Sequence, residues 1–344
     1  MHSSLPADPV DPRARAAPRL FKKRVADDTA LSADSTSLFR FGEQCNYRCP
    51  MCSNTGDPAL FFHETEELLR RAAFLRDFGF KRVMVTGGEP TIHPGFWTVV
   101  EQLASDAMRW DINTHGRSFS QPGFAARAFD TGLQRAIVSM HSFDPTVGAA
   151  IFGVQEKAHA ESLDGIEQMV AAGVEVVLNC VLNRLNLAHL GEYLSAARSR
   201  FGGDVAFKFV FPTMIGKGGN WPAIAELRYD DVRDSMRTLR ARVAELGARV
   251  SFESFPNCVL GDRDSVNVGR SGFGESHYLD DATGDQVYAM RHIEAELSAY
   301  ADVCRRCSVL PICPGISRLY ARKFGVSELV PWTDGPGDRQ GGTG

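Results

Sequence analysis

Short runs of apolar and β-branched residues alternate along the chain with longer segments whose apolar residues recur every three or four positions. The short runs, which are typical of buried strands, occupy residues 38–41, 83–86, 110–114, 135–139, 175–182 and 205–210. The longer segments, which have the periodicity of helices, occupy residues 65–78, 95–104, 124–129, 163–172 and 190–201. This strict alternation predicts an α/β fold with a parallel sheet and right-handed crossovers.

The segments on either side of this α/β region lack its alternation. Residues 1–36 contain four prolines and scattered charges without sustained periodicity, which predicts a flexible N-terminal arm. Residues 213–249 combine a glycine-rich loop with an amphipathic helix at 229–246, and we interpret them as a linker. Residues 331–344 have the composition of a disordered tail. The α/β region is therefore expected to occupy residues 37–212.

The composition agrees with a folded globular protein. Of its 344 residues, 44% are hydrophobic and 23% are charged, which is ordinary for globular chains. The formal net charge is −4, so no overall basic field favours nucleic acid or an anionic membrane as a partner. No run approaches the roughly 18 apolar residues of a membrane span, and residues 1–20 lack the apolar core of a signal peptide. We therefore expect a cytoplasmic protein.

Three of the eight cysteines gather directly after the first expected strand, at Cys45, Cys49 and Cys52. The cytosol keeps thiols reduced, so such a group favours metal ligation or catalysis over disulfides. A structural zinc ion needs four protein ligands, and the sequence offers no fourth one nearby. A [4Fe–4S] cluster held by three cysteines leaves one iron open for an exogenous ligand, and this spacing favours that interpretation.

A second motif follows the second expected strand, where Gly87, Gly88, Glu89 and Pro90 stand in sequence. Glycines at a strand end let a ligand approach the backbone closely, and a glutamate beside them can accept a hydrogen bond from an ammonium group. A zinc knuckle followed by an unrelated glycine turn is the alternative interpretation.

Together the two motifs resemble those of the radical S-adenosylmethionine (SAM) superfamily. Its CxxxCxxC loop matches the three cysteines, and its GGEP motif matches residues 87–90. The resemblance implies a partial (β/α)6 barrel over residues 37–212, with a [4Fe–4S] cluster and SAM as cofactors. It also implies that the reactive face lies at the carboxyl ends of the strands.

The resemblance also suggests residues that contact SAM and the substrate. Met51 precedes the third cysteine, where many members carry an aromatic residue near the adenine, and a thioether can pack there instead. Ser139 and Asn179 lie late in the fourth and fifth strands, where the family binds the ribose and carboxylate of SAM. His141 and His115 are candidates for contacts with the substrate. Turn formation or helix capping is the alternative role for such polar residues.

A second group of cysteines lies near the end of the chain. Cys304, Cys307 and Cys313 form a closely spaced run, and Cys258 precedes them by 46 residues. Four cysteines can close a site completely, which permits either a structural zinc ion or a second [4Fe–4S] cluster. Spacing alone does not decide between these two.

This second group resembles the SPASM/twitch class of radical SAM enzymes, which carry auxiliary clusters in a C-terminal extension. The class has a CxxCxxxxxCxxxC run; the chain matches its first three cysteines and has Ser317 at the fourth. The resemblance implies a small iron–sulfur domain at residues 250–330 with one auxiliary [4Fe–4S] cluster, for which Cys258 is the ligand outside the run. A polar loop in this domain carries His277 and Tyr278, two further candidates for catalysis.

The family resemblance implies an oxidoreductase that cleaves SAM reductively to a 5′-deoxyadenosyl radical, which abstracts a hydrogen atom from the substrate. An auxiliary cluster would accept or relay an electron, which favours a net oxidation or a cross-link. Residues 39–53 resemble the corresponding segment of maturases for His-Xaa-Ser-type peptides, so modification of a ribosomal peptide is the leading expectation. Oxidation of a small natural-product intermediate is the alternative, and a non-catalytic iron–sulfur electron carrier is an alternative of another class.

These expectations imply partners as well. A radical SAM enzyme needs an external electron donor such as flavodoxin or ferredoxin. The arm at residues 1–36 is too short for an attached leader-binding domain, so a peptide substrate would need a separate recognition protein or none.

Overall fold

The structure, a computed structural model, describes residues 31–32, 34–52, 61–212, 223–261 and 276–333. Most of the expected N-terminal arm, the glycine-rich loop at 213–222 and most of the expected tail lie outside the described residues. The strands are β1 (Thr36–Arg40), β2 (Arg82–Thr86), β3 (Arg109–Thr114), β4 (Leu133–Ser139), β5 (Glu175–Val181), β6 (Ala206–Val210), β7 (Val250–Glu253), β8 (Ser276–Leu279), β9 (Val287–Ala289), β10 (Ser298–Ala299) and β11 (Ile316–Ser317).

The helices alternate with the strands of the first two thirds of the chain. They are α2 (Thr65–Phe78), α3 (Phe96–Ser105), α4 (Phe124–Asp130), α5 (Pro145–Phe152), α6 (Glu156–Ala171), α7 (Leu190–Phe201), α8 (Tyr229–Leu246), α9 (Asn257–Leu260), α10 (Met290–Leu297) and α11 (Arg318–Phe324). Short 3-10 turns are η2 (Pro90–Ile92), η3 (Arg117–Ser120), η4 (Leu187–His189), η6 (Ala223–Ala225), η7 (Asp302–Arg306) and η8 (Leu310–Ile312).

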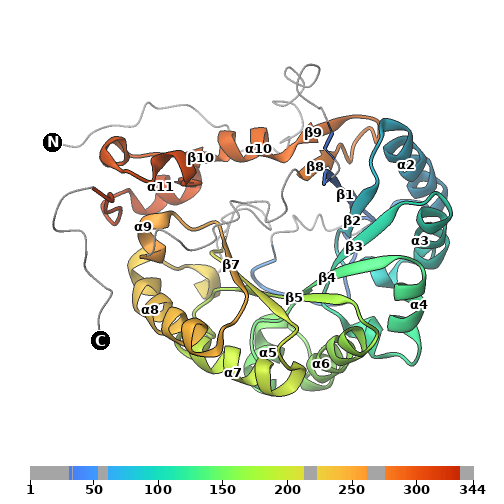
Figure 1. The fold of residues 1–344 in the computed structure, drawn as a ribbon, viewed down its shortest axis with the longest axis horizontal. Helices are drawn as coiled ribbons and strands as arrows, with labels where there is room; N and C mark the ends of the chain where they lie inside the picture. Colours follow the sequence, from blue (N-terminus) through green and yellow to red (C-terminus); the bar gives the residue numbers. More distant parts are fainter. Residues whose placement is uncertain (1–30, 33, 53–60, 213–222, 262–275, 334–344) are drawn as a thin grey trace.

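One open, curved sheet organises the fold. Within the described residues its strand order is β7-β6-β5-β4-β3-β2-β1-β8-β9, and neighbouring strands are parallel except for the antiparallel pair β8–β9. Figure 1 shows the strands forming the inner wall of an arc while α2 to α8 cover its outer side. The α/β class with a partial barrel, predicted from the alternation and the family resemblance, is confirmed.

The sheet is larger than the six strands expected from the sequence. β7 pairs with β6, with Val250 opposite Phe207, and β8 adds to the far side of β1, with Ser276 opposite Thr36. β7 and β8 have four residues each and β9 has three, too few for the alternation to stand out in the sequence. The expected division after residue 249 stays a prediction, but the sheet continues across it.

Side-chain alternation in the strands separates a packed outer face from a polar inner one. Phe39 of β1 is fully buried in the outer core, while its neighbours Leu38 and Arg40 line a cavity on the inner face. The helices contribute the other half of that core; α2, for example, buries Leu68 and Leu75. None of the helices in the described ranges is long and apolar enough to cross a lipid bilayer.

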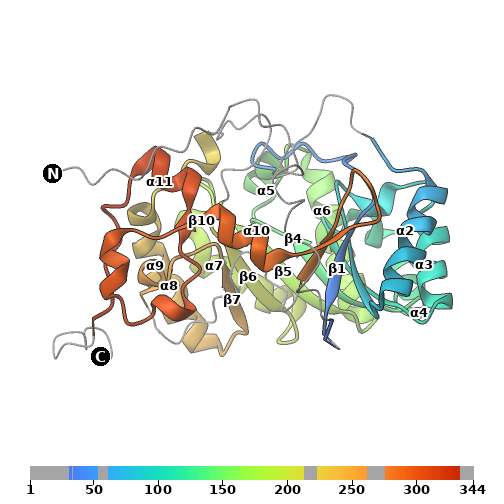
Figure 2. The ribbon, with the colours of Figure 1, turned by 90° about the horizontal axis from the view of Figure 1, so that it is seen from above.

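The C-terminal segment packs against the far end of the sheet. Figures 1 and 2 show it running from β9 through α10 along the open side of the arc to α11, beside α8 and α9. The ring of Tyr320 in α11 stacks on that of Tyr229 in α8 with centroids 4.0 Å apart, and the Tyr320 hydroxyl accepts a hydrogen bond from the Tyr229 backbone N–H. This packing fixes the cysteine-bearing segment to the sheet domain.

Candidate functional site

A cavity of about 490 Å³ lies inside the arc of strands. Its lining comes from segments far apart in the sequence and includes most of the residues expected to bind iron or SAM. Among its members are Cys45, Met51, Cys49, Cys52, Gly87, Gly88, Glu89, Asn113, His115, Ser139, His141, Asn179, Lys208 and Glu253. The structure therefore brings the CxxxCxxC loop and the GGEP motif to one place.

The cysteine loop is held by hydrogen bonds of its own backbone. The Tyr47 N–H donates to the Cys45 sulfur at 3.3 Å, and the Cys52 N–H donates to the Cys49 carbonyl at 3.2 Å. Burial raises the pKa of the Cys45 thiol to about 11, so a cationic centre is needed to keep this sulfur as a thiolate. Within the described ranges, no group of three or more His, Cys, Asp or Glu residues is arranged to hold a single metal ion.

The two glycines line the cavity and also make a close backbone contact with the cysteine loop. A Cβ atom at Gly87 would lie 2.4 Å from the Gly42 carbonyl oxygen, and one at Gly88 would lie 2.1 Å from the Gln44 oxygen. The Gly88 N–H donates to the Gly42 oxygen at 2.9 Å. The missing side chains thus let the end of β2 pack against the backbone that leads into the cysteine loop, in addition to leaving room at the cavity wall.

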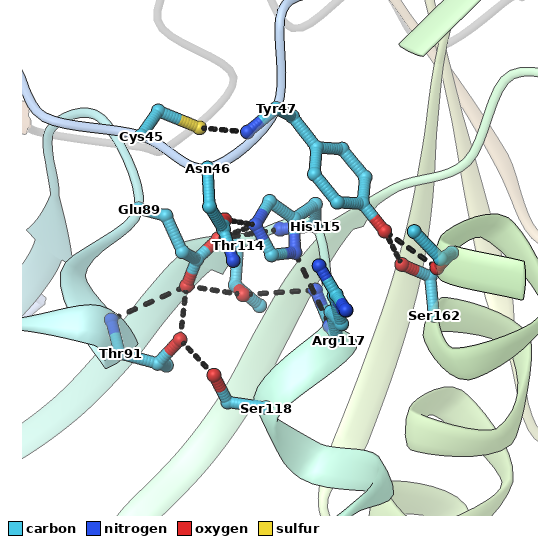
Figure 3. A network of polar contacts seen from close by, with 12 residues as sticks. Cys45, Asn46, Tyr47, Glu89, Thr91, Thr114, His115, Arg117, Ser118 and Ser162 are labelled. Atoms are coloured by element: carbon cyan, nitrogen blue, oxygen red, sulfur yellow. Dashed lines mark hydrogen bonds and ion pairs between the residues drawn. The ribbon is translucent and has the colours of Figure 1, made fainter. Parts of the chain in front are cut away.

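Glu89 lines the cavity, and its carboxylate accepts hydrogen bonds from the protein; its expected contact with an ammonium group stays a prediction. One oxygen accepts hydrogen bonds from the hydroxyls of Thr91 and Thr114 at 2.6 and 2.8 Å, and the other accepts from the His115 backbone N–H at 2.9 Å. Figure 3 shows this network. The carboxylate is almost fully buried and ties β2 to β3. Pro90 starts the turn η2 and is not among the residues lining the cavity.

His115 extends this network to the cysteine loop. Its Nε2 lies 2.7 Å from Asn46 Oδ1, and its ring stacks on Tyr47 with centroids 3.8 Å apart. Its Nδ1 accepts from the Arg117 backbone N–H, so Nε2 is the protonated nitrogen. Burial lowers the pKa of His115, which keeps the ring neutral. The histidine predicted to contact substrate therefore supports the loop between the first two cysteines.

Tyr47 is a supporting residue that the sequence did not single out. Its hydroxyl lies 2.7 Å from the Ala158 carbonyl oxygen and 2.6 Å from the Ser162 hydroxyl, both on α6. Its ring is thereby fixed between α6 and His115. A lone tyrosine between two cysteines carries no sequence signal for this role, because its partners lie more than 60 positions away along the chain.

Ser139 and Asn179 stand side by side on β4 and β5 and both line the cavity. The side-chain oxygen of Asn179 is buried and has no hydrogen-bond partner among the described residues. A buried amide oxygen of this kind is satisfied when a ligand donates a hydrogen bond to it. This unpaired atom fits the hydroxyl or ammonium groups of SAM, with Met51 on the same cavity wall.

Of the three candidates for catalysis, His141 lines the cavity, whereas His277 and Tyr278 are not among its described lining residues. Burial lowers the pKa of His141 to about 3, and its Nδ1 accepts from the Val181 N–H at 3.2 Å. His277 is buried edge-on against Phe80 at 5.3 Å. The Tyr278 hydroxyl donates to Asp281, 2.8 Å away. These contacts hold local structure.

The cavity also contains a charged pair that sequence reasoning missed. Lys208 of β6 donates to Glu253 of β7 across 3.0 Å, and both side chains are largely buried. Burial raises the pKa of Glu253, and the neighbouring Lys208 lowers it in part. The available signal was a lysine between Phe207 and Phe209 in an otherwise apolar strand, because strand alternation then points the charge away from the core.

The second group of cysteines also comes together. Cys258, Cys304, Cys307 and Cys313 line one small apolar pocket of about 20 Å³. Burial raises the pKa of Cys258 to about 11, and the nearby Cys313 and Cys304 raise it further. Ser317 lies in β11 and is not among the pocket's residues, so Cys258 supplies the fourth thiol there.

The sequence of the chain is similar to a known protein family. Residues 39–197 match the family model described as the radical SAM superfamily. These residues form a radical SAM domain. The resemblance carried by the CxxxCxxC loop and the GGEP motif is therefore confirmed, and most of the residues that line the cavity belong to this domain.

Curated relatives match about half of the chain. A protein of Sulfolobus acidocaldarius named "Probable GTP 3′,8-cyclase" is 26% identical over 178 residues, which cover 50% of this chain and 55% of the relative. A protein of the same name from Thermococcus kodakarensis is 32% identical over 158 residues, which cover 45% and 50%. The match thus spans about half the length of these relatives.

Solved structures show a similar fold. Streptococcus suis SuiB bound to the precursor peptide SuiA superposes with a TM-score of 0.51 at 13% identity, covering 64% of this chain and 48% of SuiB. Native anSMEcpe with bound AdoMet superposes with a TM-score of 0.50 at 14% identity, covering 63% and 64%. At these identities the likeness concerns the fold.

Proposed function

We propose that the protein is a radical SAM enzyme that oxidises or cross-links a peptide substrate with the help of an auxiliary [4Fe–4S] cluster. One observation carries the proposal: three cysteines line the same cavity as the side-chain oxygen of Asn179, which has no hydrogen-bond partner in the described part of the chain. Pure electron carriers usually ligate their clusters fully, so a set of three cysteines favours an enzyme over a carrier.

The residues of the cavity have separate tasks in this proposal. Cys45, Cys49 and Cys52 hold a [4Fe–4S] cluster, while Ser139 and Asn179 receive polar groups of SAM. When bound, the cluster and SAM supply a 5′-deoxyadenosyl radical, which removes hydrogen from an unactivated C–H bond. The chain itself keeps the cysteine loop in position through the contacts of Tyr47 and Asn46 with His115.

The charge of the cavity favours a peptide over a nucleoside triphosphate. Among the described lining residues the lysine and arginine side chains are Arg40 and Lys208. Arg40 lies 2.6 Å from Glu43 and 2.9 Å from Asp281, and Lys208 lies 3.0 Å from Glu253. Both cations are thus neutralised by carboxylates, and a triphosphate would meet no excess positive charge on this wall. A peptide segment carries little charge and does not need excess positive charge in the cavity to bind.

The curated relatives give a second candidate. Their name, GTP 3′,8-cyclase, makes a guanine nucleotide the alternative substrate, and it rests on 26–32% identity over about half of each chain. Oxidation of a small natural-product intermediate also suits the near-neutral cavity.

Further parts of the proposal concern the second cysteine group and the partners. Cys258, Cys304, Cys307 and Cys313 would hold the auxiliary cluster, because four thiols share one apolar pocket. A zinc ion is the alternative occupant. An external one-electron donor such as flavodoxin or ferredoxin and a separate peptide-recognition protein complete the proposed system.

Anaerobic turnover tests the proposal. The reconstituted protein is incubated with SAM and dithionite, and 5′-deoxyadenosine is measured; we expect its formation by the wild type and its loss in Cys49→Ala. Cys180→Ala is the matched control, because Cys180 is buried and lines neither pocket. Full activity of Cys49→Ala would refute the assigned role of the loop.

A second arm of the experiment addresses the substrate. Deuterated GTP and deuterated candidate peptides are supplied separately, and transfer of deuterium into 5′-deoxyadenosine is measured by mass spectrometry. Transfer from a peptide supports the proposal. Transfer from GTP alone would replace the peptide by the nucleotide as substrate.

A further inference from the structure

The cavity has two chemically different ends. The cysteine loop follows β1, and the sheet order places β6 and β7 at the opposite end of the parallel strands, with β4 and β5 between them. Ser139 and Asn179 stand on these middle strands, and Asn179 is the register neighbour of Lys208. The cysteine loop therefore lies several strands away from the pair Lys208–Glu253, and Asn179 stands between them, next to Lys208.

Stability does not explain a charged pair in this position. Taking two charges out of water offsets most of their attraction, so a buried ion pair contributes little compared with apolar side chains of similar size. The outer face of β6 already has two fully packed residues, Phe207 and Phe209. Lys208 and Glu253 instead point to the inner face, where the lining also includes the apolar Val210 and Met290.

The pair offers a donor and an acceptor next to each other. The Lys208 ammonium group has three N–H donors, of which one is directed at Glu253 Oε2, and a carboxylate has several lone pairs for further donors. The two charges cancel, so a ligand with a net charge gains nothing from the pair as a whole. An uncharged group with adjacent C=O and N–H can form a hydrogen bond with each member of the pair.

We propose that Lys208 and Glu253 anchor the substrate through an amide edge, with the ammonium donating to the amide oxygen and the carboxylate accepting from the amide N–H. This inference rests on the proposed function and names the substrate group that the cavity recognises. A peptide bond carries such an edge, and so does the lactam of guanine. Both groups have a carbonyl next to an N–H. Because the pair has no net charge, it favours an uncharged peptide over a guanine nucleotide with charged phosphates.

The test uses the reconstituted full-length protein with SAM bound. Saturation-transfer NMR measures binding of three probes: an N-acetylated, N-methylamidated dipeptide, guanosine and GTP. We expect the dipeptide to bind and to lose about tenfold or more in affinity in Lys208→Met and in Glu253→Gln. Equilibrium dialysis measures SAM on the same proteins, and the loss for the dipeptide should exceed any loss for SAM.

Two controls keep the result interpretable. Lys323 and Glu226 form the same kind of pair at the same 3.0 Å on the surface, so Lys323→Met should leave dipeptide binding as in the wild type. The double variant Lys208→Met/Glu253→Gln leaves no unpaired buried charge, so its fold is expected to persist while dipeptide binding stays weak.

The outcomes separate this inference from the proposed function. Unchanged dipeptide binding in the double variant would overturn it, as would binding of guanosine in place of the dipeptide. A loss of SAM affinity equal to that of the dipeptide would assign the pair to the cofactor side and overturn it too. Formation of 5′-deoxyadenosine by the wild type is the independent readout for the proposed function.

Discussion

The imidazole ring of His115 lies flat on the phenol ring of Tyr47, with centroids 3.8 Å apart and ring planes 14° from parallel. Tyr47 belongs to the cysteine loop, whereas His115 follows β3 and is bonded to Glu89 after β2. Two strands of the sheet thus support the loop that carries the proposed iron ligands through one stacked pair.

Replacing His115 by Ala should therefore loosen the cysteine loop. The stack and the hydrogen bond to Asn46 are both lost, and we expect unfolding free energy to fall by about 2–4 kcal/mol and iron content after reconstitution to fall with it. Denaturant unfolding and iron analysis measure the two effects. His115→Phe keeps a ring to stack on Tyr47 and should recover part of the stability. An equal loss of unfolding free energy in His115→Ala and His115→Phe would contradict a role for the ring stack.

Gly88→Ala should disrupt the contact between the end of β2 and the cysteine loop. Its Cβ would lie 2.1 Å from the Gln44 oxygen, a backbone atom that cannot rotate away. We expect a destabilisation of about 2–4 kcal/mol and little cluster at the first site. Gly191→Ala is the matched control, because the nearest atom to its Cβ is 3.7 Å away and the residue lies inside α7. A normal iron content in Gly88→Ala would show that the contact is dispensable.

Asn179→Leu should weaken SAM binding without weakening the fold. The side-chain oxygen makes no hydrogen bond among the described residues, so its removal leaves no protein donor unsatisfied. We expect SAM affinity to fall about tenfold, measured by equilibrium dialysis, at an unchanged unfolding midpoint. Asn186→Ala should instead lower the unfolding midpoint and leave SAM affinity unchanged, because Asn186 donates a hydrogen bond to the His141 carbonyl. Unaltered SAM affinity in Asn179→Leu would remove this residue from the cofactor site.

The second cysteine group predicts a definite metal content. Wild-type protein with two [4Fe–4S] clusters should hold about eight irons per chain, and Cys304→Ala/Cys307→Ala about four. Iron, sulfide and zinc are determined on anaerobically reconstituted protein. A wild type with about four irons and one zinc ion would favour the structural zinc site instead.

His141 predicts a loss of stability in acid. Burial lowers its pKa to about 3, whereas an unfolded histidine titrates near 6.5. Between these two values the unfolded chain binds a proton that the folded chain does not, so stability falls as pH decreases from about 6.5 towards 3, by up to about 1.4 kcal/mol per pH unit for this residue. Denaturant unfolding across this range should give a shallower pH dependence in His141→Gln. His189→Gln, a change at an exposed histidine, should keep the wild-type dependence.

The sequence was sufficient for features that repeat locally or stand close together. Strand and helix alternate over many residues, which predicted the parallel sheet, and the family resemblance placed Cys45, Cys49 and Cys52 in one site with Gly87. The family resemblance also grouped Cys258 with the later cysteine run, and the structure brings the four together in one pocket.

Features that depend on residues far apart in the chain could not be predicted from the sequence. The hydrogen bonds that Glu89 accepts from Thr114 and His115, about 25 residues later, left no trace in the sequence. β8 was interpreted as part of a polar loop because four residues acquire strand character only by pairing with β1. Lys208 and Glu253 come from strands 45 residues apart, and neither position alone indicates a pair.

The pairing of β1 with β8 bears on how the protein is made. Of the strands in the described residues, β1 is the first to leave the ribosome, yet its second neighbour, Ser276–Leu279, emerges some 240 residues later. At about 5–20 residues per second, one edge of the nascent sheet stays open for roughly 10–50 seconds of synthesis. The unpaired N–H and C=O groups of an exposed strand edge can form hydrogen bonds with other chains during that interval. We therefore expect chaperone supply and translation speed to influence the yield of this protein.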